Sequence, residues 1–372
     1  MKVLCDRDGL FTAFSMIDGV APARSPKPVL QNVKFIADPD LGTILMATDL
    51  ELGIRHRVIG VGIDEPGAVI LPGVPVRSIL RTIKEHELSL ATEGDHIVVR
   101  GVHSEFKLTS IDPNEFPEVP DFAATSYHVV TAANLKRIIR RTIFATDTES
   151  TRYALGGVLI ELQPESIAMV GTDGRRLAYA MAVAEGENSP PTPTGTPVVP
   201  VKSLKLIDRN LNDDDPPVHI AIQGTTAILV RTENSVIYSR LVEGRFPQYR
   251  DVFPKGAEIR IPLEVGVLKN TVEQASVATN DDSRGVDFDF DEGMLRLSSQ
   301  AADIGSSHVE LPIQYSGPRL TIRFDPKYLL EALKALDDSS TIHAELIDPK
   351  SPAVFKTDDL YQYVVMPLAR DN

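Results

Sequence analysis

Hydrophobic residues along this chain follow two spacings, and each spacing predicts one kind of element. Within residues 131–145 the apolar positions recur at helical intervals, which predicts a helix with one buried stripe. That stripe consists of Leu135, Ile138, Ile139 and Ile143. Phe106 and Leu108 instead alternate with polar residues, which is typical of a strand with one buried side. The chain therefore combines helices with strands in an α+β arrangement.

The same succession of elements occurs three times along the chain. Each copy opens with a strand and a helix, at residues 1–20, 127–145 and 258–278. A second helix follows in each copy, at residues 74–84, 200–211 and 326–336. The copies close at residues 115–120, 245–250 and 363–367. Repeats of this length are whole domains, so we expect three similar domains with two helices each, at 1–122, 127–254 and 257–372.

Composition narrows the class of protein. Apolar residues make up 42% of the 372 positions and charged residues 24%, which is typical of a soluble globular protein. No apolar run approaches the length of a membrane span, and the first residues do not form a secretion signal. Cys5 is the only cysteine, which excludes intrachain disulfides and cysteine-rich metal sites. We expect a cytoplasmic protein without metal or cofactor.

Basic residues gather on helices although the chain is acidic overall, with a net charge of −14. Three predicted helices carry them on the face opposite the apolar stripe: Arg77, Arg81 and Lys84; Lys136, Arg137, Arg140 and Arg141; and Lys202, Lys205 and Arg209. For any single helix, a solvated polar face explains such residues better. Three such helices in one acidic protein favour a surface that contacts a polyanion through its phosphates, without reading sequence.

Three short segments carry a specific resemblance to a known family. They read Thr-Asp-Gly-Arg-Arg-Leu-Ala at 172–178, Glu-Gly-Arg-Phe-Pro-Gln-Tyr-Arg at 243–250 and Tyr-Val-Val-Met-Pro-Leu at 363–368. Supporting segments lie at 75–77 and 324–330. With these motifs in order within a threefold repeat, the chain resembles the bacterial DNA polymerase III beta subunits, the DNA sliding clamps, along essentially its whole length.

The resemblance implies a head-to-tail homodimer in which six domains close a ring. Twelve helices would line the hole, with continuous sheets outside, and the ring would encircle double-stranded DNA non-specifically. Its role would be that of a processivity factor rather than an enzyme. Its partners would be the DNA polymerase III alpha subunit, the clamp loader and other proteins that carry a clamp-binding motif.

The resemblance also implies a groove that binds short peptides of those partners. The matching positions are Thr172, Gly174, Arg175, Arg176, Leu177, Pro247, Val252, Tyr328, Val364, Val365, Met366, Pro367 and Leu368. From the residues alone, Leu177, Val364, Met366 and Leu368 suit an apolar pocket, and Arg176 suits a polar peptide group. From the sequence alone, core residues between domains explain these positions better, because buried aliphatic residues outnumber those in grooves; the resemblance reverses that order. Departures from the family pattern predict an altered peptide preference at the rim; they are Asp251, Ser283, Asp325, Lys350 and Pro352.

For DNA contact, the resemblance points to Arg24, Arg77, Tyr153 and Lys202, and the charge pattern adds Arg81, Arg137 and Arg141. For the dimer seam it points to Phe106 and Leu108, with Val277 and Ala278 as their partners. The alternative for Phe106 and Leu108 is that they face the core of their own domain, because alternation predicts a buried side without naming the neighbour.

Two other classes of function compete with a clamp. An enzyme would need a catalytic constellation around Asp173 or Asp281-Asp282, and nothing in the chain completes one. Thr48-Asp49 recurs as Thr172-Asp173, which favours turn chemistry in which the aspartate accepts backbone N–H groups. The second competitor is a monomeric multidomain scaffold that binds peptides without encircling DNA, and the mass in solution would discriminate it.

Overall fold

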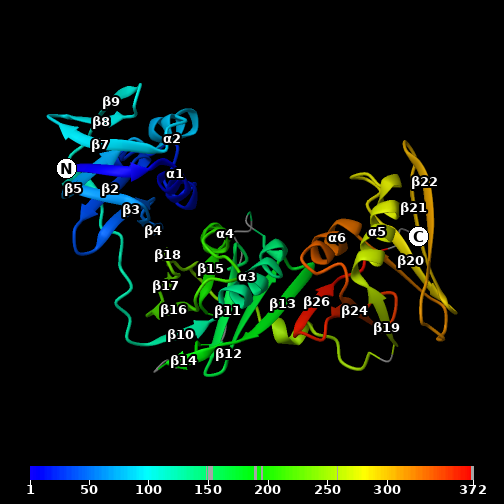
Figure 1. Ribbon diagram of the computed structural model, residues 1–372. Coiled ribbons are helices and arrows are strands. Elements are labelled where there is room, and N and C mark those ends of the chain that lie inside the picture. The colour runs from blue at the N-terminus through cyan, green and yellow to red at the C-terminus, as the bar shows by residue number, and fades with distance from the viewer. Residues whose placement is uncertain (148, 150–153, 188–190, 194–195, 258, 370–372) are drawn as a thin grey trace. The chain divides into compact units, whose positions relative to one another are not determined.

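The computed structural model describes residues 1–372 except 148, 150–153, 188–190, 194–195, 258 and 370–372. By their internal contacts the residues divide into two compact units (Figure 1). Unit 1 comprises Met1–Ala133, Glu185–Ser189 and Lys202–Leu241, and unit 2 comprises Asn134–Ala184, Pro190–Val201 and Val242–Asn372. The second repeat is thus shared between the units, because its strands extend the sheets of both neighbouring repeats.

Unit 1 contains a five-stranded sheet and a nine-stranded sheet. The first has the order β5 (Val61–Glu65), β1 (Lys2–Asp6), β7 (Glu87–Glu93), β8 (His96–Arg100) and β9 (Glu105–Thr109). The second has the order β14 (Glu185–Glu187), β10 (Tyr127–Val130), β16 (Val218–Gln223), β17 (Ala227–Arg231), β18 (Ser235–Arg240), β4 (Leu52–Val58), β3 (Gly42–Thr48), β2 (Val33–Asp38) and β6 (Gly67–Leu71). All of the pairings are antiparallel.

Unit 2 contains an eight-stranded sheet and a four-stranded sheet. The first has the order β15 (Val198–Pro200), β11 (Gly157–Gln163), β12 (Ser166–Thr172), β13 (Arg176–Val183), β26 (Tyr361–Val365), β25 (Ala353–Lys356), β24 (Thr341–Leu346) and β19 (Ile259–Glu264). The second has the order β22 (Gly305–Pro312), β21 (Met294–Ala301), β20 (Val286–Asp291) and β23 (Leu320–Phe324). In β20 the sequence Val-Asp-Phe-Asp-Phe-Asp alternates buried and half-buried residues, as a strand with one face on the core must.

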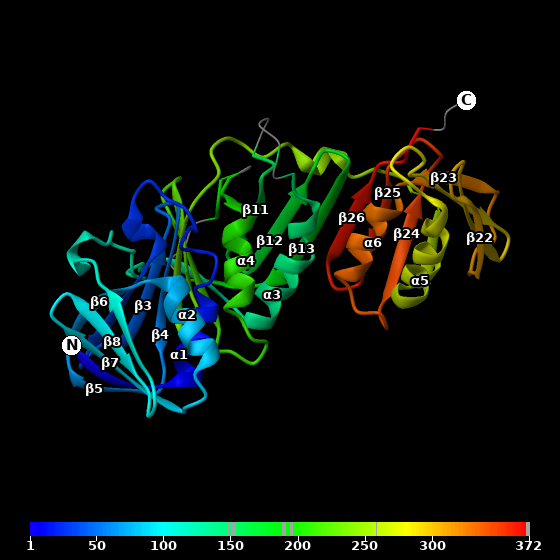
Figure 2. The same cartoon turned by 90° about the horizontal axis from the view of Figure 1, so that it is seen from above.

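Each repeat contributes two helices, as the periodicity predicts. They are α1 (Arg7–Met16) and α2 (Gly73–Thr82), α3 (Ala132–Arg140) and α4 (Val201–Arg209), and α5 (Val265–Ala275) and α6 (Pro326–Lys334). Figure 2 shows α5 and α6 side by side over the sheet that holds β24 and β26. The first turn of α6 is set by Asp325, which accepts the Lys327 N–H at 3.0 Å, and by Pro326 at the first helical position.

The third predicted helix is shorter than its sequence pattern. α3 ends at Arg140, and the chain continues into a short 3-10 turn, η3 (Ile143–Ala145). The buried Thr142 hydroxyl donates to the Ile138 carbonyl oxygen at 2.7 Å, a side-chain bond of the kind that disturbs a helix.

Neighbouring repeats are joined by one kind of strand pair. β18, the last strand of the second repeat, pairs with β4 of the first repeat in unit 1. β26, the last strand of the third repeat, pairs with β13 of the second repeat in unit 2, with Leu177 opposite Val364. β4 and β13 both follow a Thr-Asp turn, so the two joints use equivalent strands.

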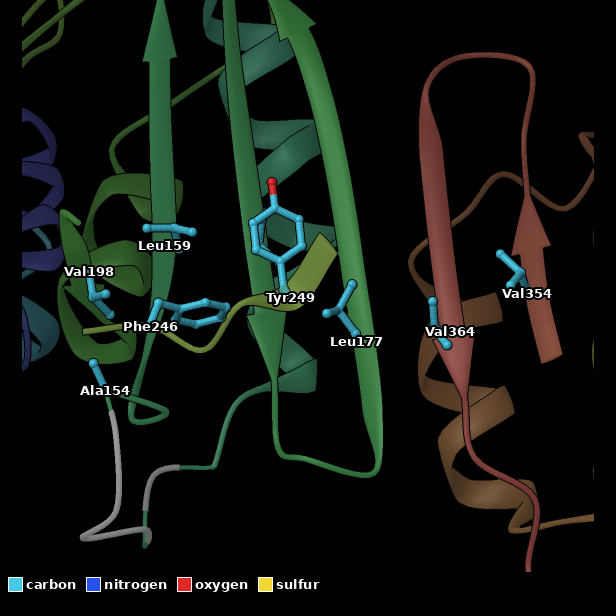
Figure 3. Packing of buried hydrophobic residues seen from close by; sticks show 9 residues of the cluster. Ala154, Leu159, Leu177, Val198, Phe246, Tyr249, Val354 and Val364 are labelled. Carbon is cyan, nitrogen blue, oxygen red and sulfur yellow. The ribbon is translucent and has the colours of Figure 1, made fainter. Parts of the chain in front are cut away.

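The joint in unit 2 lies over a hydrophobic core (Figure 3). Leu177 of β13 and Val364 of β26 are buried there with Phe246 and Tyr249 from the segment that closes the second repeat. Burial of side chains of this size stabilises the joint by about 1.5–3 kcal/mol for each residue. The closing motif Arg-Phe-Pro therefore packs its phenylalanine under the very strands that carry the candidate site.

Candidate functional site

The Thr-Asp-Gly motif is a tight turn that positions the first strand of the site. The Thr172 hydroxyl donates to the Arg176 carbonyl at 2.6 Å and accepts the Gly174 N–H at 3.1 Å. Asp173 Oδ1 accepts the N–H groups of Arg175 and Arg176 at 2.9 and 3.0 Å. Gly174 has φ of 85°, a conformation that glycine adopts without strain. The motif therefore forms a hydrogen-bonded turn, as the repetition of Thr-Asp predicts. Both carboxylate oxygens of Asp173 accept hydrogen bonds within it.

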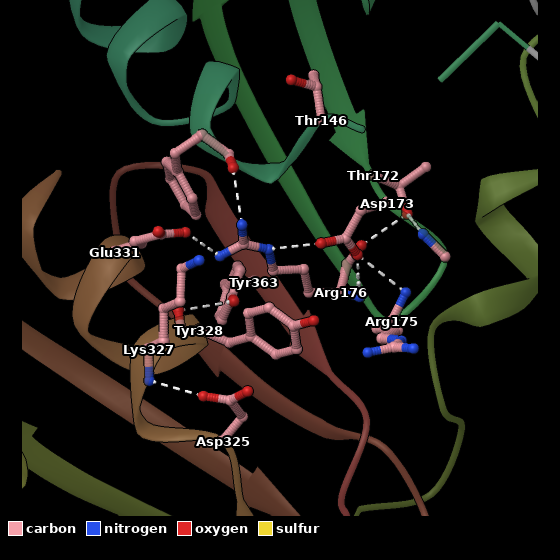
Figure 4. A network of polar contacts seen from close by, with 12 residues as sticks. Thr146, Thr172, Asp173, Arg175, Arg176, Asp325, Lys327, Tyr328, Glu331 and Tyr363 are labelled. Atoms are coloured by element: carbon pink, nitrogen blue, oxygen red, sulfur yellow. Dashed lines mark hydrogen bonds and ion pairs between the residues drawn. The ribbon is translucent and has the colours of Figure 1, made fainter. Parts of the chain in front are cut away.

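Arg176 lies inside the structure rather than on a binding surface, with an exposed fraction of 7% (Figure 4). Its guanidinium donates to Asp173 Oδ2 at 2.9 Å, Glu331 Oε2 at 2.5 Å and the Phe144 carbonyl oxygen at 2.8 Å. The rings of Phe144 and Tyr328 lie 5.4 and 4.5 Å from its central carbon. Burial acts to lower its pKa, but Tyr363, Glu331 and Asp173 outweigh burial and hold the pKa above the usual range.

That Arg176 contacts a peptide group stays a prediction, because this structure shows its guanidinium bonded within the protein. All three of its guanidinium nitrogens bond to protein, and a buried cation keeps such partners because losing one is costly. Arg176 fastens the Thr-Asp turn of the second repeat to α6 of the third repeat. The partner that sequence reasoning missed is Glu331, which lies 155 positions away with no local motif to mark it.

The remaining groove candidates separate by depth. Thr172, Leu177, Val364 and Val365 are buried, as the core interpretation of these residues predicts. Pro247, Tyr328, Pro367 and Leu368 are half-buried, and Gly174, Arg175, Val252 and Met366 are exposed. The residues on and after β26 are held in place by main-chain bonds, from the Met366 N–H to the Arg175 carbonyl at 2.9 Å and from the Leu368 N–H to the Arg323 carbonyl at 2.8 Å.

Arg175, Tyr328 and Met366 form the accessible edge of this site. The Tyr363 hydroxyl donates to the Tyr328 carbonyl at 2.8 Å and so ties α6 to β26. A hydrogen bond with the Tyr328 side chain raises the pKa of the exposed Arg175. Met366 is 40% exposed beside these groups, which leaves a flexible apolar side chain free to contact a ligand.

The residues that depart from the family pattern have mixed positions. Asp325 is buried and caps α6, a task that asparagine performs equally well. Asp251 and Lys350 are exposed, and Ser283 and Pro352 are half-buried. The substitution at Asp325 is therefore explained by the helix cap, while the other four leave the predicted change of peptide preference a prediction.

The DNA-contact candidates differ in how free their charges are. Arg24 and Arg81 are exposed. Arg77 pairs with Asp18 at 2.5 Å, and Lys202 pairs with Asp49 at 2.5 Å. Tyr153 lies outside the described residues.

In unit 2, Arg137 and Arg141 both donate to Asp359, at 2.9 and 2.7 Å. Arg141 is 8% exposed and lies 5.5 Å from the Tyr361 ring centre, so its expected place on a solvated helix face is wrong. The reason is that α3 ends at Arg140, so Arg141 lies outside the helix and its side chain reaches Asp359 of the third repeat.

At the predicted seam, Phe106 and Leu108 are half-buried on the same side of β9. Within the described residues β9 pairs only with β8, and β22 pairs only with β21. Val277, in the 3-10 turn η5 (Ser276–Ala278), is 72% exposed, whereas Ala278 is 4% exposed and belongs to the core of its own repeat.

The described part of the chain holds no group of three or more histidine, cysteine, aspartate or glutamate side chains that is arranged to bind a metal ion. Its helices are all too short or too polar to cross a membrane.

Comparison with known proteins matches the full length of the chain. The N-terminal, central and C-terminal domains of the DNA polymerase III beta subunit match residues 1–120, 129–248 and 250–369. The beta sliding clamp of Escherichia coli K12 is 30% identical over 99% of this chain and 100% of its own length. The beta sliding clamp of Pseudomonas aeruginosa is 28% identical, with the same coverage.

Solved structures agree with the sequence matches. The DNA polymerase III subunit beta of Pseudomonas aeruginosa has a TM-score of 0.90 at 27% identity, and a second structure of it, bound to griselimycin, has a TM-score of 0.91. Both comparisons cover 100% of each chain. The three-domain clamp fold and the processivity role that the motifs imply are thereby confirmed, and the chain belongs to the DNA polymerase III beta subunit family, the sliding clamps.

Proposed function

We propose that two copies of this chain close head to tail into a ring around double-stranded DNA. The observation that carries the proposal is the pair of equivalent joints, β18 with β4 and β26 with β13. Each joint pairs the last strand of one repeat with the fourth strand of the repeat before it. Among the described strands, β9 is the last strand of the first repeat and β22 is the fourth strand of the third, and neither takes part in such a joint. A third joint of the same kind between two copies uses both.

The side chains at the two open edges suit this joint. Phe106 and Leu108 present a half-buried apolar row along β9, and Val277 is exposed beside β22. An exposed strand edge with apolar side chains is a liability in a monomer, because it can pair with other chains. Burial in a closed, two-fold interface removes that liability. Ala278 would contribute from below, by supporting Val277.

Contact with DNA would be weak and non-specific. We assign it to Arg24 and Arg81, whose charges are exposed, and to Arg77 and Lys202, which would exchange Asp18 and Asp49 for phosphates. Arg137 would contribute less, since Asp359 holds it. Such contacts weaken steeply with salt, and a closed ring does not depend on them for retention.

The peptide groove would use the accessible edge of the second and third repeats. We assign contact with a partner peptide to Arg175, Pro247, Val252, Tyr328, Met366, Pro367 and Leu368. Thr172, Gly174, Leu177, Val364 and Val365 would shape the floor beneath it, with Arg176 fastening the floor. The partners would be the DNA polymerase III alpha subunit, the clamp loader and other cytoplasmic proteins with a clamp-binding motif. The three domains would be 1–122, 127–254 and 257–372.

Mass in solution tests the ring directly. Light scattering at micromolar concentration should give twice the 40.7 kDa of one chain. Leu108→Lys places a charge in the seam and should shift the protein to one chain mass. Lys107→Ala, on the opposite side of β9, is the matched control and should remain a dimer. A wild-type protein of one chain mass would favour the monomeric scaffold instead.

A further inference from the structure

The first strand of each repeat has two edges, and the third repeat leaves one of them open. In the first repeat β1 lies between β5 and β7, and in the second β10 lies between β14 and β16. In the third repeat β19 pairs with β24 and has no other neighbour among the described strands. The repeat thus lacks the strand that covers this position in the other two.

The segment that corresponds to β5 is bonded elsewhere. After β22, the Ile313 N–H donates to the Gly293 carbonyl at 3.0 Å, and the Gly293 N–H donates to the Tyr315 carbonyl at 2.8 Å. The Tyr315 hydroxyl donates to the Pro318 carbonyl at 2.6 Å and closes the loop on itself. These bonds hold the segment on the turn between β20 and β21, away from the edge of β19.

Space remains between β19 and this loop. Two adjoining cavities of about 630 and 510 Å³ lie along the strand. Arg260 and Tyr315 line the first, Pro262 and Pro312 line the second, and Gln314 lines both. Together they form a trough between β19 and the loop of residues 311–318.

The backbone groups of β19 that face the trough follow from alternation. The Val265 N–H donates to the Ser340 carbonyl on the β24 side, so Arg260, Pro262 and Glu264 direct their backbone groups to the open side. Pro262 has no N–H, and proline in a sheet occupies an edge in this orientation. The edge therefore offers the Arg260 N–H, the Glu264 N–H and three carbonyl oxygens, and Pro262 limits how readily it pairs.

The covering strands of the other repeats show which side chains suit this edge. Lys2 of β1 pairs with Asp64 of β5 at 3.2 Å, and the Tyr127 hydroxyl of β10 donates to Glu187 of β14 at 3.1 Å. Counted back from the start of the following helix, Arg260 occupies the position of Lys2 and Tyr127. Arg260 is exposed and has no ion pair with any described residue.

We propose that the open edge of β19 binds an extended acidic segment of a partner protein as an added antiparallel strand. Backbone bonds to Arg260 and Pro262 provide the pairing, as in other cases of strand addition. A carboxylate of the added strand would pair with the Arg260 side chain, as Asp64 pairs with Lys2 and Glu187 with Tyr127 in the first two repeats. This surface is distinct from the groove around Met366, so the ring can hold a second segment of a partner.

The chain's own covering strand provides the probe. A fluorescein-labelled peptide of residues 59–66, Ile-Gly-Val-Gly-Ile-Asp-Glu-Pro, is titrated against the full-length protein by anisotropy. Arg260→Glu should weaken binding about tenfold or more, since it places like charges opposite each other. A peptide with lysine at both acidic positions should bind Arg260→Glu better than it binds the wild type. Arg284→Glu and Met366→Ala are controls and should bind the acidic peptide as the wild type does.

The backbone part of the proposal has its own test. Pro262→Leu restores the residue found at this position in β1 and adds one donor to the edge, which should tighten binding about two- to tenfold. Arg260→Pro removes a donor and should abolish binding. Hydrogen exchange of residues 259–264 should slow with peptide. Two results would overturn the proposal. One is that neither Arg260→Glu nor Pro262→Leu changes the affinity for the peptide, and the other is that neither the wild type nor Pro262→Leu binds the peptide at all.

Discussion

Leu50 occupies a left-handed backbone conformation, and the equivalent position in the second repeat is a glycine. Leu50 has φ of 80°, and Gly174 has φ of 85° in the equivalent Thr-Asp turn. Both turns use the same bonds, since Asp49 Oδ1 accepts the N–H groups of Glu51 and Leu52 at 3.0 and 2.7 Å. A left-handed conformation costs an L-residue about 1–2 kcal/mol, so Leu50 stores strain that its turn bonds hold in place.

Glycine at this position should therefore stabilise unit 1. Leu50→Gly relieves the strain but enlarges the entropy of the unfolded chain, and should raise the free energy of unfolding by about 0.5–1 kcal/mol. Gly174→Ala makes the opposite change in the equivalent turn and should lower it by about 1 kcal/mol. Urea unfolding measures both. The same sign of change in the two variants would contradict this account of the turns.

His56 begins a buried chain of hydrogen bonds that links the first two repeats within unit 1. His56 Nδ1 lies 2.7 Å from Ser235 Oγ, and the Ser235 hydroxyl donates to Asn210 Oδ1 at 2.8 Å. Because Ser235 has given its only proton to Asn210, Nδ1 must be the donor to Ser235. Asn210 Nδ2 donates to the Met16 carbonyl at 3.1 Å, at the end of α1. Burial lowers the pKa of His56 to about 4.

This lowered pKa predicts an acid-sensitive joint. The ordinary histidine pKa is near 6.5, so between about pH 6.5 and 4 the unfolded state takes up a proton that the folded state does not. Stability from this group is therefore complete above pH 6.5 and falls by on the order of 3 kcal/mol as the pH drops to 4. His56→Gln does not titrate, so its hydrogen-exchange protection at β4 and β18 should change less across this window. Equal pH dependence in both proteins would refute the assignment.

Charged residues mark the limit of what could be predicted from the sequence at this scale. Helical spacing alone placed Arg141 on the same solvated helix face as Arg137, and the motif match assigned Arg176 to contact with the peptide. Both arginines are instead buried against carboxylates, Asp359 and Glu331, that lie far away in the chain. Local patterns report which face of an element is apolar, but not which distant acid turns a basic side chain inward.

At the scale of elements, the repeat and its periodicities were sufficient for the helices. The six predicted helices are present with ends shifted by a few residues, and α3 is shortened where Thr142 competes for a backbone carbonyl. The resemblance implied continuous sheets, but the residue pattern did not reveal which strands join adjacent repeats, because alternation in β18 or β26 gives a buried side without naming β4 or β13 as the neighbour. The same limit hid the uncovered edge of β19.

The residues that follow the last strand, β26, are the ones whose mutation tests the proposed peptide groove. Met366→Ala removes an exposed apolar side chain on the residue whose N–H bonds to the Arg175 carbonyl, and should weaken binding of a consensus clamp-binding peptide about tenfold, measured by fluorescence anisotropy. Val183→Ala truncates an equally apolar, 70% exposed side chain at the far end of β13 and is the matched control.

Leu177 is unsuited to the same test. It is 2% exposed, so Leu177→Lys would disrupt the core of the joint as well as any groove above it. Equal affinity of the wild type and Met366→Ala for the peptide would remove Met366 from the groove.

At the scale of the whole molecule, the negative net charge is compatible with binding to DNA once the closed ring is considered. A charge of −14 disfavours tight contact with DNA, because such contact depends on the neutralisation of phosphates. A closed ring needs no tight contact, since it stays on the duplex by encircling it. If they contact DNA as proposed, the exposed Arg24 and Arg81 would need only to guide a duplex that the ring already holds.

Retention on DNA circles tests the closed ring most directly. The protein is loaded by its clamp loader onto a nicked circular plasmid, washed at high salt, and assayed before and after a restriction enzyme linearises the plasmid. High salt suppresses phosphate contacts but leaves a topological link intact. We predict that the protein remains on the circle through the wash and leaves after linearisation, and that Leu108→Lys is lost from both. Loss of the wild-type protein from the intact circle, or its persistence on the linear form, would contradict the account.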